Sequence, residues 1–152
     1  MDSQSELSLV KKLTAIASFL PAFQEGKDLS SLAQFVAAAY ANNWVSSDIN
    51  WVEWMKTDEA KKLRDDPTAL AKASDHDLTC LLTTLIRQER FCEGSLEGAY
   101  NSGLLTGILQ RAASMLDEMT LQYAISRQEL EAERAQTLGE LNEFLVKLGY
   151  VS

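Results

Sequence analysis

The fold of this chain is decided by residues 74–94, which read SDHDLTCLLTTLIRQERFCEG. Apolar residues at positions 78, 81, 82, 85 and 86 recur with the three- and four-residue spacing of one α-helical face. Ser74 or Asp75 can cap the first turn, because either side chain can accept a hydrogen bond from a free backbone N–H. This stretch therefore predicts a helix whose leucine face enters a hydrophobic core.

The end of this helix is a dense charged cluster that runs from Arg87 to Gly94. On a wheel of about 100° per residue, Glu89 falls on the leucine stripe, whereas Arg87 points the opposite way, beside Thr83. A carboxylate turned toward a core must be compensated, so we expect Glu89 to meet an arginine from elsewhere or backbone donors. Gly94 is expected to close the helix in a left-handed conformation.

This cluster has two interpretations, which the sequence leaves open. Glu89 and Gly94 are candidates for a structural lock that fastens the helix end to the next segment. Alternatively, Arg87 and Arg90 grip an anion in the bidentate manner of guanidinium groups. The candidates for ligand or partner contact are Arg87, Arg90, Phe91, Glu93, Trp51 and Trp54.

The composition of the whole chain favours helix. Its 152 residues include only two prolines and seven glycines, and good helix formers dominate. We expect an all-α fold, a compact bundle of six to seven helices with a long C-terminal helix. The first helix is predicted over residues 5–20, ending before Pro21, and a later one from Trp51 to about Arg64.

The C-terminal part is expected to be a helical extension, residues 119–152, of a core formed by residues 1–118. The 3-4-3 spacing of four leucines suits a short helix–helix seam. The extension therefore either mediates association or packs back on the core within a single domain. These leucines are Leu138, Leu141, Leu145 and Leu148.

Three tryptophans lie within eleven residues, Trp44, Trp51 and Trp54. They either form a second core beneath a loop or line a groove that anchors a ligand or a partner. The sequence alone does not choose between these interpretations.

The net charge of −8 argues against direct nucleic-acid binding, which needs clustered lysine and arginine. No run approaches the ~20 apolar residues of a membrane span, and the N-terminus lacks a secretory pattern. Two cysteines suit a reduced setting, so we expect a cytoplasmic protein.

Catalytic chemistry is not expected. Cys92 is the plausible thiol nucleophile, but His76 lies sixteen residues earlier, about 24 Å away along a helix. One histidine and two separated cysteines do not have zinc-site spacing. We therefore expect no catalytic residue, no metal site and no cofactor.

Several short motifs follow one another along the chain: residues 19–23, 44–45, 51–54, 66–67, 82–87 and 90–94, then Gly103 and residues 108–111. In this order they resemble a bacterial family called domain of unknown function 6508. The resemblance covers residues 9–116 approximately, and it implies a mostly helical domain without an established activity. The C-terminal helix beyond residue 120 looks like an extension of the family pattern. We expect a protein of bacterial or phage origin.

These observations favour a non-enzymatic protein-interaction module that uses the C-terminal helix and the surface around Arg87 and Phe91. Its partner is expected to be a protein, and a second copy of the chain, bound through the C-terminal helix, is one candidate. One alternative is an acidic inhibitor that covers the basic nucleic-acid-binding surface of another protein. A second alternative is a small sensor or enzyme that binds a nucleotide-like anion through Arg87, Glu89 and Arg90.

Overall fold

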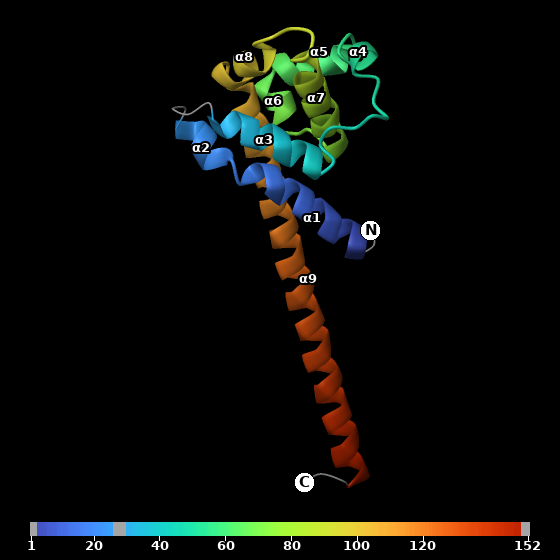
Figure 1. The fold of residues 1–152 in the computed structure, drawn as a ribbon. Helices are drawn as coiled ribbons and strands as arrows, with labels where there is room; N and C mark the ends of the chain where they lie inside the picture. The colour runs from blue at the N-terminus through green and yellow to red at the C-terminus, as the bar shows by residue number, and fades with distance from the viewer. Residues whose placement is uncertain (1–2, 26–29, 150–152) are drawn as a thin grey trace. The chain divides into compact units, whose positions relative to one another are not determined.

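The computed structural model describes residues 3–25 and 30–149 (Figure 1). These residues form helices and no strand, so the prediction of an all-α fold with a long C-terminal helix is confirmed. The chain divides into two compact units, Met1–Leu116 and Asp117–Ser152. The described ranges contain nine helical segments: α1 (Ser3–Ala17), α2 (Leu20–Glu25), α3 (Ser30–Ala41), α4 (Trp51–Trp54), α5 (Asp58–Asp65), α6 (Pro67–Leu70), α7 (Asp75–Gln88), α8 (Ser95–Asn101) and α9 (Leu104–Leu148).

Helix α7 is the centre of the first unit. It starts with a capping box, in which Ser74 Oγ accepts from the Asp77 N–H and the Asp77 carboxylate accepts from the Ser74 N–H, both at 3.1 Å. Residues 78–86 are buried on every side. Helices α4 and α8 both pack against α7, and a helix that is covered all round is a core helix rather than an amphipathic surface helix.

Trp44 joins three parts of this unit. Its side chain is fully buried, and its Nε1–H donates to the Lys12 carbonyl of α1 at 2.7 Å. Lys12 Nζ lies 4.3 Å from the Trp44 ring centroid and donates to Thr79 Oγ1 of α7 at 2.9 Å. Burial lowers the pKa of Lys12, although the nearby charge of Asp75 opposes this. Trp44 is therefore a core residue.

Two helix boundaries differ from the sequence prediction. Pro21 does not end a long first helix, because α1 ends at Ala17 and Pro21 lies in the first turn of α2, where a missing N–H costs nothing. The helix expected from Trp51 to Arg64 is two helices. Asn50 caps α4 by accepting from the Glu53 N–H, and Thr57 starts α5 by accepting from the Ala60 N–H.

The first part of α9 belongs to the core of the first unit, where it buries Leu105, Ile108, Leu109 and Ala112. At Gly107 the backbone comes so close to α6 that an added Cβ would lie 2.9 Å from Leu70 Cδ2. Glycine permits this approach because it has no side chain.

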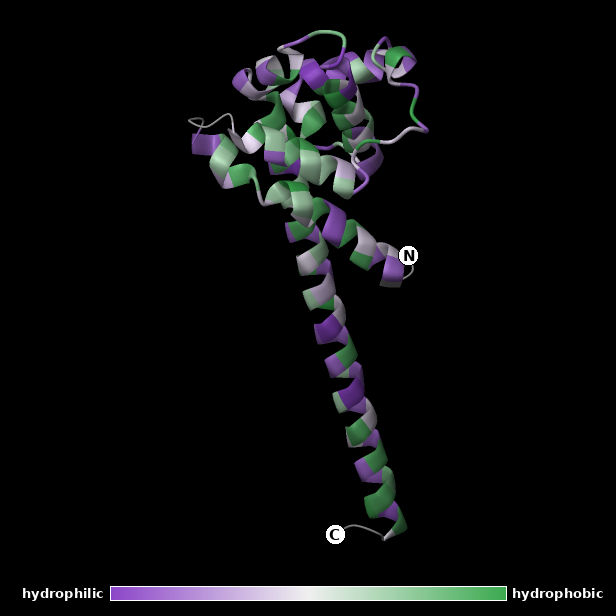
Figure 2. Ribbon diagram, in the orientation of Figure 1, coloured by the Kyte–Doolittle hydropathy of each residue, from purple (hydrophilic) through white to green (hydrophobic). Residues whose placement is uncertain are grey.

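The second unit is described from residue 117 to residue 149, as the rest of α9 and Gly149. Hydrophilic residues gather in the middle of its helix, and hydrophobic residues lie near the C-terminal end (Figure 2). Within this unit, large apolar side chains are exposed by 46% to 67%. They are Leu121, Tyr123, Ile125, Leu130, Leu138, Leu141, Phe144, Val146 and Leu148.

Candidate functional site

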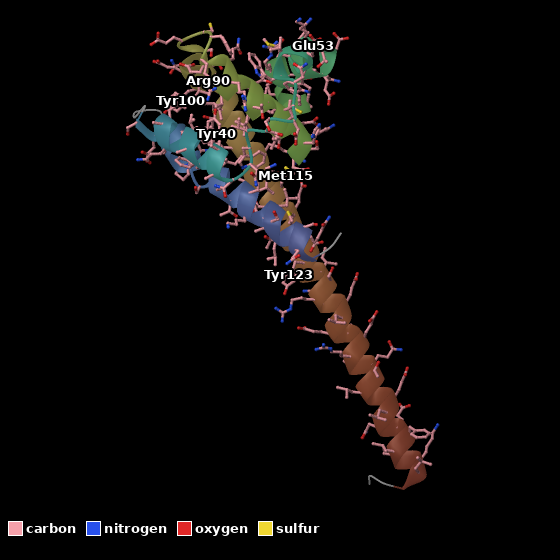
Figure 3. All side chains as sticks on the ribbon, turned by 45° about the vertical axis from the view of Figure 1, so that its right-hand side comes forward. Tyr40, Glu53, Arg90, Tyr100, Met115 and Tyr123 are labelled. Atoms are coloured by element: carbon pink, nitrogen blue, oxygen red, sulfur yellow. The ribbon has the colours of Figure 1, made fainter. Side chains whose placement is uncertain are left out.

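An open pocket of about 400 Å³ lies at the C-terminal end of α7. Helix α4 contributes Trp51 and Val52, α7 contributes Arg87, and the turn after α7 contributes Arg90 and Phe91. Figures 1 and 3 show α4 and this turn at the same end of the first unit, with Arg90 labelled in Figure 3. Segments 35 or more residues apart in the sequence thus form one site, which we call the arginine–aromatic pocket.

The two aromatic rings of this pocket are stacked. The ring centroids of Trp51 and Phe91 are 6.1 Å apart, with an angle of 27° between the ring planes. Phe91 is nevertheless 80% exposed, so its outer face is open to solvent. Exposed aromatic rings in a fixed orientation are suited to stacking against a flat ligand.

The helical wheel suggested that Arg87 extends freely into solvent, but the structure shows that it does not. The 44–54 segment covers that side of α7, where Thr83 is fully buried and donates to the Trp44 carbonyl at 3.2 Å. Arg87 is therefore half-buried, and its Nε is buried without a hydrogen-bond partner. Among the residues that the structure describes, no carboxylate forms an ion pair with Arg87 or Arg90.

Glu89 faces the next helix instead of the pocket. Its carboxylate accepts from the N–H groups of Gly94 at 2.9 Å and Leu96 at 2.7 Å, and from Ser95 Oγ at 3.1 Å. The backbone donors of Leu96 and Gly94 lower the pKa of Glu89. Of the two kinds of partner considered for this carboxylate, it meets backbone donors, and it stabilises the first turn of α8, where Gly94 supplies no side-chain cap.

Gly94 is left-handed, with φ 90°, but it lies directly before α8 rather than directly after α7, which ends at Gln88. Glu93 is exposed and Trp54 is half-buried, and neither side chain lines the pocket. The structure thus brings together Trp51, Arg87, Arg90 and Phe91, and it separates them from the other candidates.

A second cluster, at the start of α7, was missed by the sequence reasoning. Cys80 Sγ lies 3.6 Å from His76 Nε2, a contact that their four-residue spacing on one helix could have indicated. Burial and the charges of Asp77 and Glu59 raise the pKa of Cys80. Because the nucleophilic form of cysteine is the thiolate, this thiol is poorly suited to catalysis.

The pKa of Glu59 is raised because its carboxyl group shares a hydrogen bond with Asp77. Within residues 3–25 and 30–149, no group of three or more histidine, cysteine, aspartate or glutamate side chains could hold a metal ion. No helix in these ranges is both long enough and apolar enough to cross a membrane.

The helix of the second unit carries a second candidate surface. On a wheel of about 100° per residue, the four expected leucines share one face with three further apolar residues, which the sequence reasoning had not used. The seven-residue spacing of positions 116, 123, 130, 137 and 144 is the signal that could have revealed them. We call this surface the C-terminal apolar face: Tyr123, Leu130, Leu138, Leu141, Phe144, Leu145 and Leu148.

Two arginines interrupt the middle of the C-terminal apolar face. Arg127 and Arg134 lie on the same side of the wheel as Leu130 and Leu141, and Arg127 pairs with Glu131 one turn later at 3.7 Å. The face thus has apolar residues toward both ends and charged residues at its centre.

Residues 27–118 match the model of a family of unknown function, DUF6508. No curated protein and no solved structure matches the chain.

Proposed function

This chain belongs to the DUF6508 family of unknown function, and we propose from its own surface that it is a non-enzymatic protein-interaction module that pairs with a second copy of itself. The proposed contact is the C-terminal apolar face, and the reduced cysteines suit a cytoplasmic setting.

The observation that carries this proposal is the exposure of nine large apolar side chains on one helix, residues 117–148. A lone helix has no core in which to bury them, and most of the stability of protein helices comes from packing an apolar face. Large contiguous apolar surfaces on soluble proteins usually mark contact sites. A second helix of the same length, placed against the C-terminal apolar face, would bury six of them: Tyr123, Leu130, Leu138, Leu141, Phe144 and Leu148.

The heptad spacing suits a two-helix coiled coil, which we place in the antiparallel direction. Positions 123, 130, 137 and 144 alternate with positions 127, 134, 141 and 148 at the spacing of the two core positions of a coiled coil. In an antiparallel pair that overlaps these helices fully, Tyr123 of one copy meets Leu141 of the other, and the reverse contact forms at the other end. Leu138 and Leu145 flank this seam on one side.

The central arginines support the same direction. A parallel, in-register pair would set Arg127 and Arg134 each against the same arginine of the second copy, and like charges in contact are unfavourable. The antiparallel pair sets Arg127 opposite Thr137 and Arg134 opposite Leu130. Arg134 then also lies near Glu131 and Glu133 of the second copy, so charges of opposite sign face each other.

The first test is the molar mass of the full chain, measured by light scattering during size-exclusion chromatography. We expect a dimer that Leu141→Glu dissociates, because the substitution buries a carboxylate in the seam. Val146→Glu is the matched control. Val146 is exposed to a similar extent, 47% against 51% for Leu141, but it lies on the opposite side of the helix. A monomeric parent chain, or equal effects of the two substitutions, would contradict the proposal.

The direction is tested by crosslinking with a short bis-maleimide in a Cys92→Ser background. A mixture of Tyr123→Cys and Leu141→Cys chains should crosslink as a mixed dimer, whereas each variant alone should not, since its two thiols would be about 27 Å apart. Crosslinking of either variant with itself would indicate a parallel pair.

A further inference from the structure

We propose that the arginine–aromatic pocket binds a nucleoside monophosphate, with its phosphate on the two guanidinium groups and its base against the aromatic pair. This binding site is on the first unit and goes beyond the proposed pairing through the C-terminal apolar face.

The pocket concentrates positive charge on a chain whose net charge is −8. Arg87 and Arg90 are three residues apart at one helix end, and neither forms an ion pair with any described residue. The nearest carboxylate in sequence, Glu89, is already occupied by three hydrogen bonds at the start of α8. The chain therefore leaves this charge available to an anion from outside.

The two guanidinium groups suit a phosphate ligand. Arg87 and Arg90 both line the pocket. The planar guanidinium group presents its N–H donors in the geometry that phosphate oxygens accept. Because Arg87 Nε is itself buried, a phosphate would bind the terminal Nη groups of Arg87, and Arg90 would contribute the second positive charge.

The aromatic pair explains why the ligand should carry a flat ring as well as a phosphate. Phe91 is stacked on Trp51 yet 80% exposed, so an apolar surface borders the guanidinium groups. Nucleobases stack on such rings with little dependence on base identity. A free phosphate ion would contact only the arginines, and the surface of the aromatic rings would stay exposed to water.

The size of the pocket favours a single nucleotide. Its volume of about 400 Å³ is near the lower end of small-ligand sites. The phosphodiester backbone of a nucleic acid would extend over a protein of net charge −8, where repulsion opposes binding. A phosphate monoester carries up to two negative charges, which two arginines can neutralise.

The lining chemistry indicates binding rather than turnover. The side chains of Trp51, Val52, Arg87, Arg90 and Phe91 supply cations and apolar surface, and none of them is a general base or a nucleophile at neutral pH. The bound nucleotide would therefore dissociate without being chemically converted, as expected for a sensor or for a site that regulates binding to a partner.

The test is isothermal titration calorimetry of the full chain at low ionic strength. Adenosine 5′-monophosphate should bind at least tenfold more tightly than either adenosine or inorganic phosphate, because only the nucleotide uses both halves of the pocket. Its affinity should fall as salt rises. No heat with the nucleotide at millimolar concentration, or phosphate alone binding as tightly, would overturn the proposal. Tighter binding of phosphotyrosine would also overturn it in favour of a phosphorylated protein.

Exposed positions allow variants that keep the fold. Arg90→Ala should weaken nucleotide binding about tenfold or more, and Phe91→Ala should weaken it about fivefold or more, whereas Phe91→Trp should retain it. Lys61→Ala is the control, since it removes one exposed positive charge outside the pocket. Equal weakening by Arg90→Ala and Lys61→Ala would show a nonspecific charge effect and overturn the assignment.

Discussion

Helix α7 and residues 117–148 of α9 are both regular helices, but they differ in what surrounds them. In α7, the nine consecutive residues 78–86 are buried, including Thr79, Thr83 and Thr84, whose hydroxyl groups donate to backbone carbonyls. In the helix of the second unit, nine large apolar side chains are exposed. The comparison teaches that helix formation and burial are separate properties: the first follows from local sequence, and the second depends on neighbours.

The largest expected effect compares one leucine from each helix. Leu82→Ala in α7 should destabilise the first unit by about 2–5 kcal/mol, because it leaves a cavity in a fully buried site. Leu138→Ala should change the stability of the same unit by less than about 0.5 kcal/mol. Both changes in stability can be measured by denaturant unfolding, with the fluorescence of Trp44, Trp51 and Trp54 as the signal. Similar losses in the two variants would remove the distinction between the helices.

The next effect compares two glycines within α9. Gly107→Val should cost about 1–3 kcal/mol, because even its Cβ would meet Leu70 Cδ2 at 2.9 Å. Gly139→Val should be within about 0.5 kcal/mol of neutral, since an added Cβ there has no atom within 4 Å. Thermal unfolding of the two variants tests the pair, and a destabilised Gly139→Val protein would indicate that residue 139 is packed.

A smaller effect concerns the carboxylate at the end of α7. Glu89→Gln should lower stability at neutral pH by about 1 kcal/mol, a modest value because the site is partly exposed and screened. Glu93→Gln is the matched control and should be neutral, because Glu93 is exposed and these three donors bond to Glu89 instead. The comparison shows whether Glu89 fastens α7 to α8.

The pH dependence of this effect has a defined sign. The pKa of Glu89 is lowered in the folded state, so its stabilisation is complete above its ordinary value of 4.5 and is lost as the pH falls through the lowered value. The difference between the parent chain and Glu89→Gln should therefore shrink on acidification. A difference that stayed constant with pH would contradict the role of the charged carboxylate.

Much of the first unit could be predicted from local patterns. The Ser74 cap, the leucine face of α7 and the left-handed Gly94 follow from residue chemistry within a few positions. The break at Thr57 was missed because a second cap inside an apolar repeat competes with helix continuation. The contact of His76 with Cys80 was not predicted, because Cys80 lies on the buried side of α7, where a cysteine is ordinarily a small core residue.

The arginine–aromatic pocket could be predicted only in part. Its residues Trp51, Arg87, Arg90 and Phe91 were all candidates, yet Trp54 and Glu93 were equally plausible from the sequence. The wheel placed Arg87 on the side of α7 opposite the leucine stripe, but it did not predict that Arg87 is half-buried, because a wheel assumes one covered face. The 44–54 segment covers the other face of α7 through Trp44 and Thr83, a long-range contact that periodicity does not encode.

The sequence by itself determined that this chain is helical, where its main caps lie, and that its charged cluster follows a leucine run, because these depend on interactions within one or two turns. Only the tertiary structure decided that α7 is buried all round, that Glu89 serves α8, and that Trp51 and Phe91 stack beside two arginines. Those outcomes require segments distant in the chain to meet, and each depends on which face a neighbouring element covers.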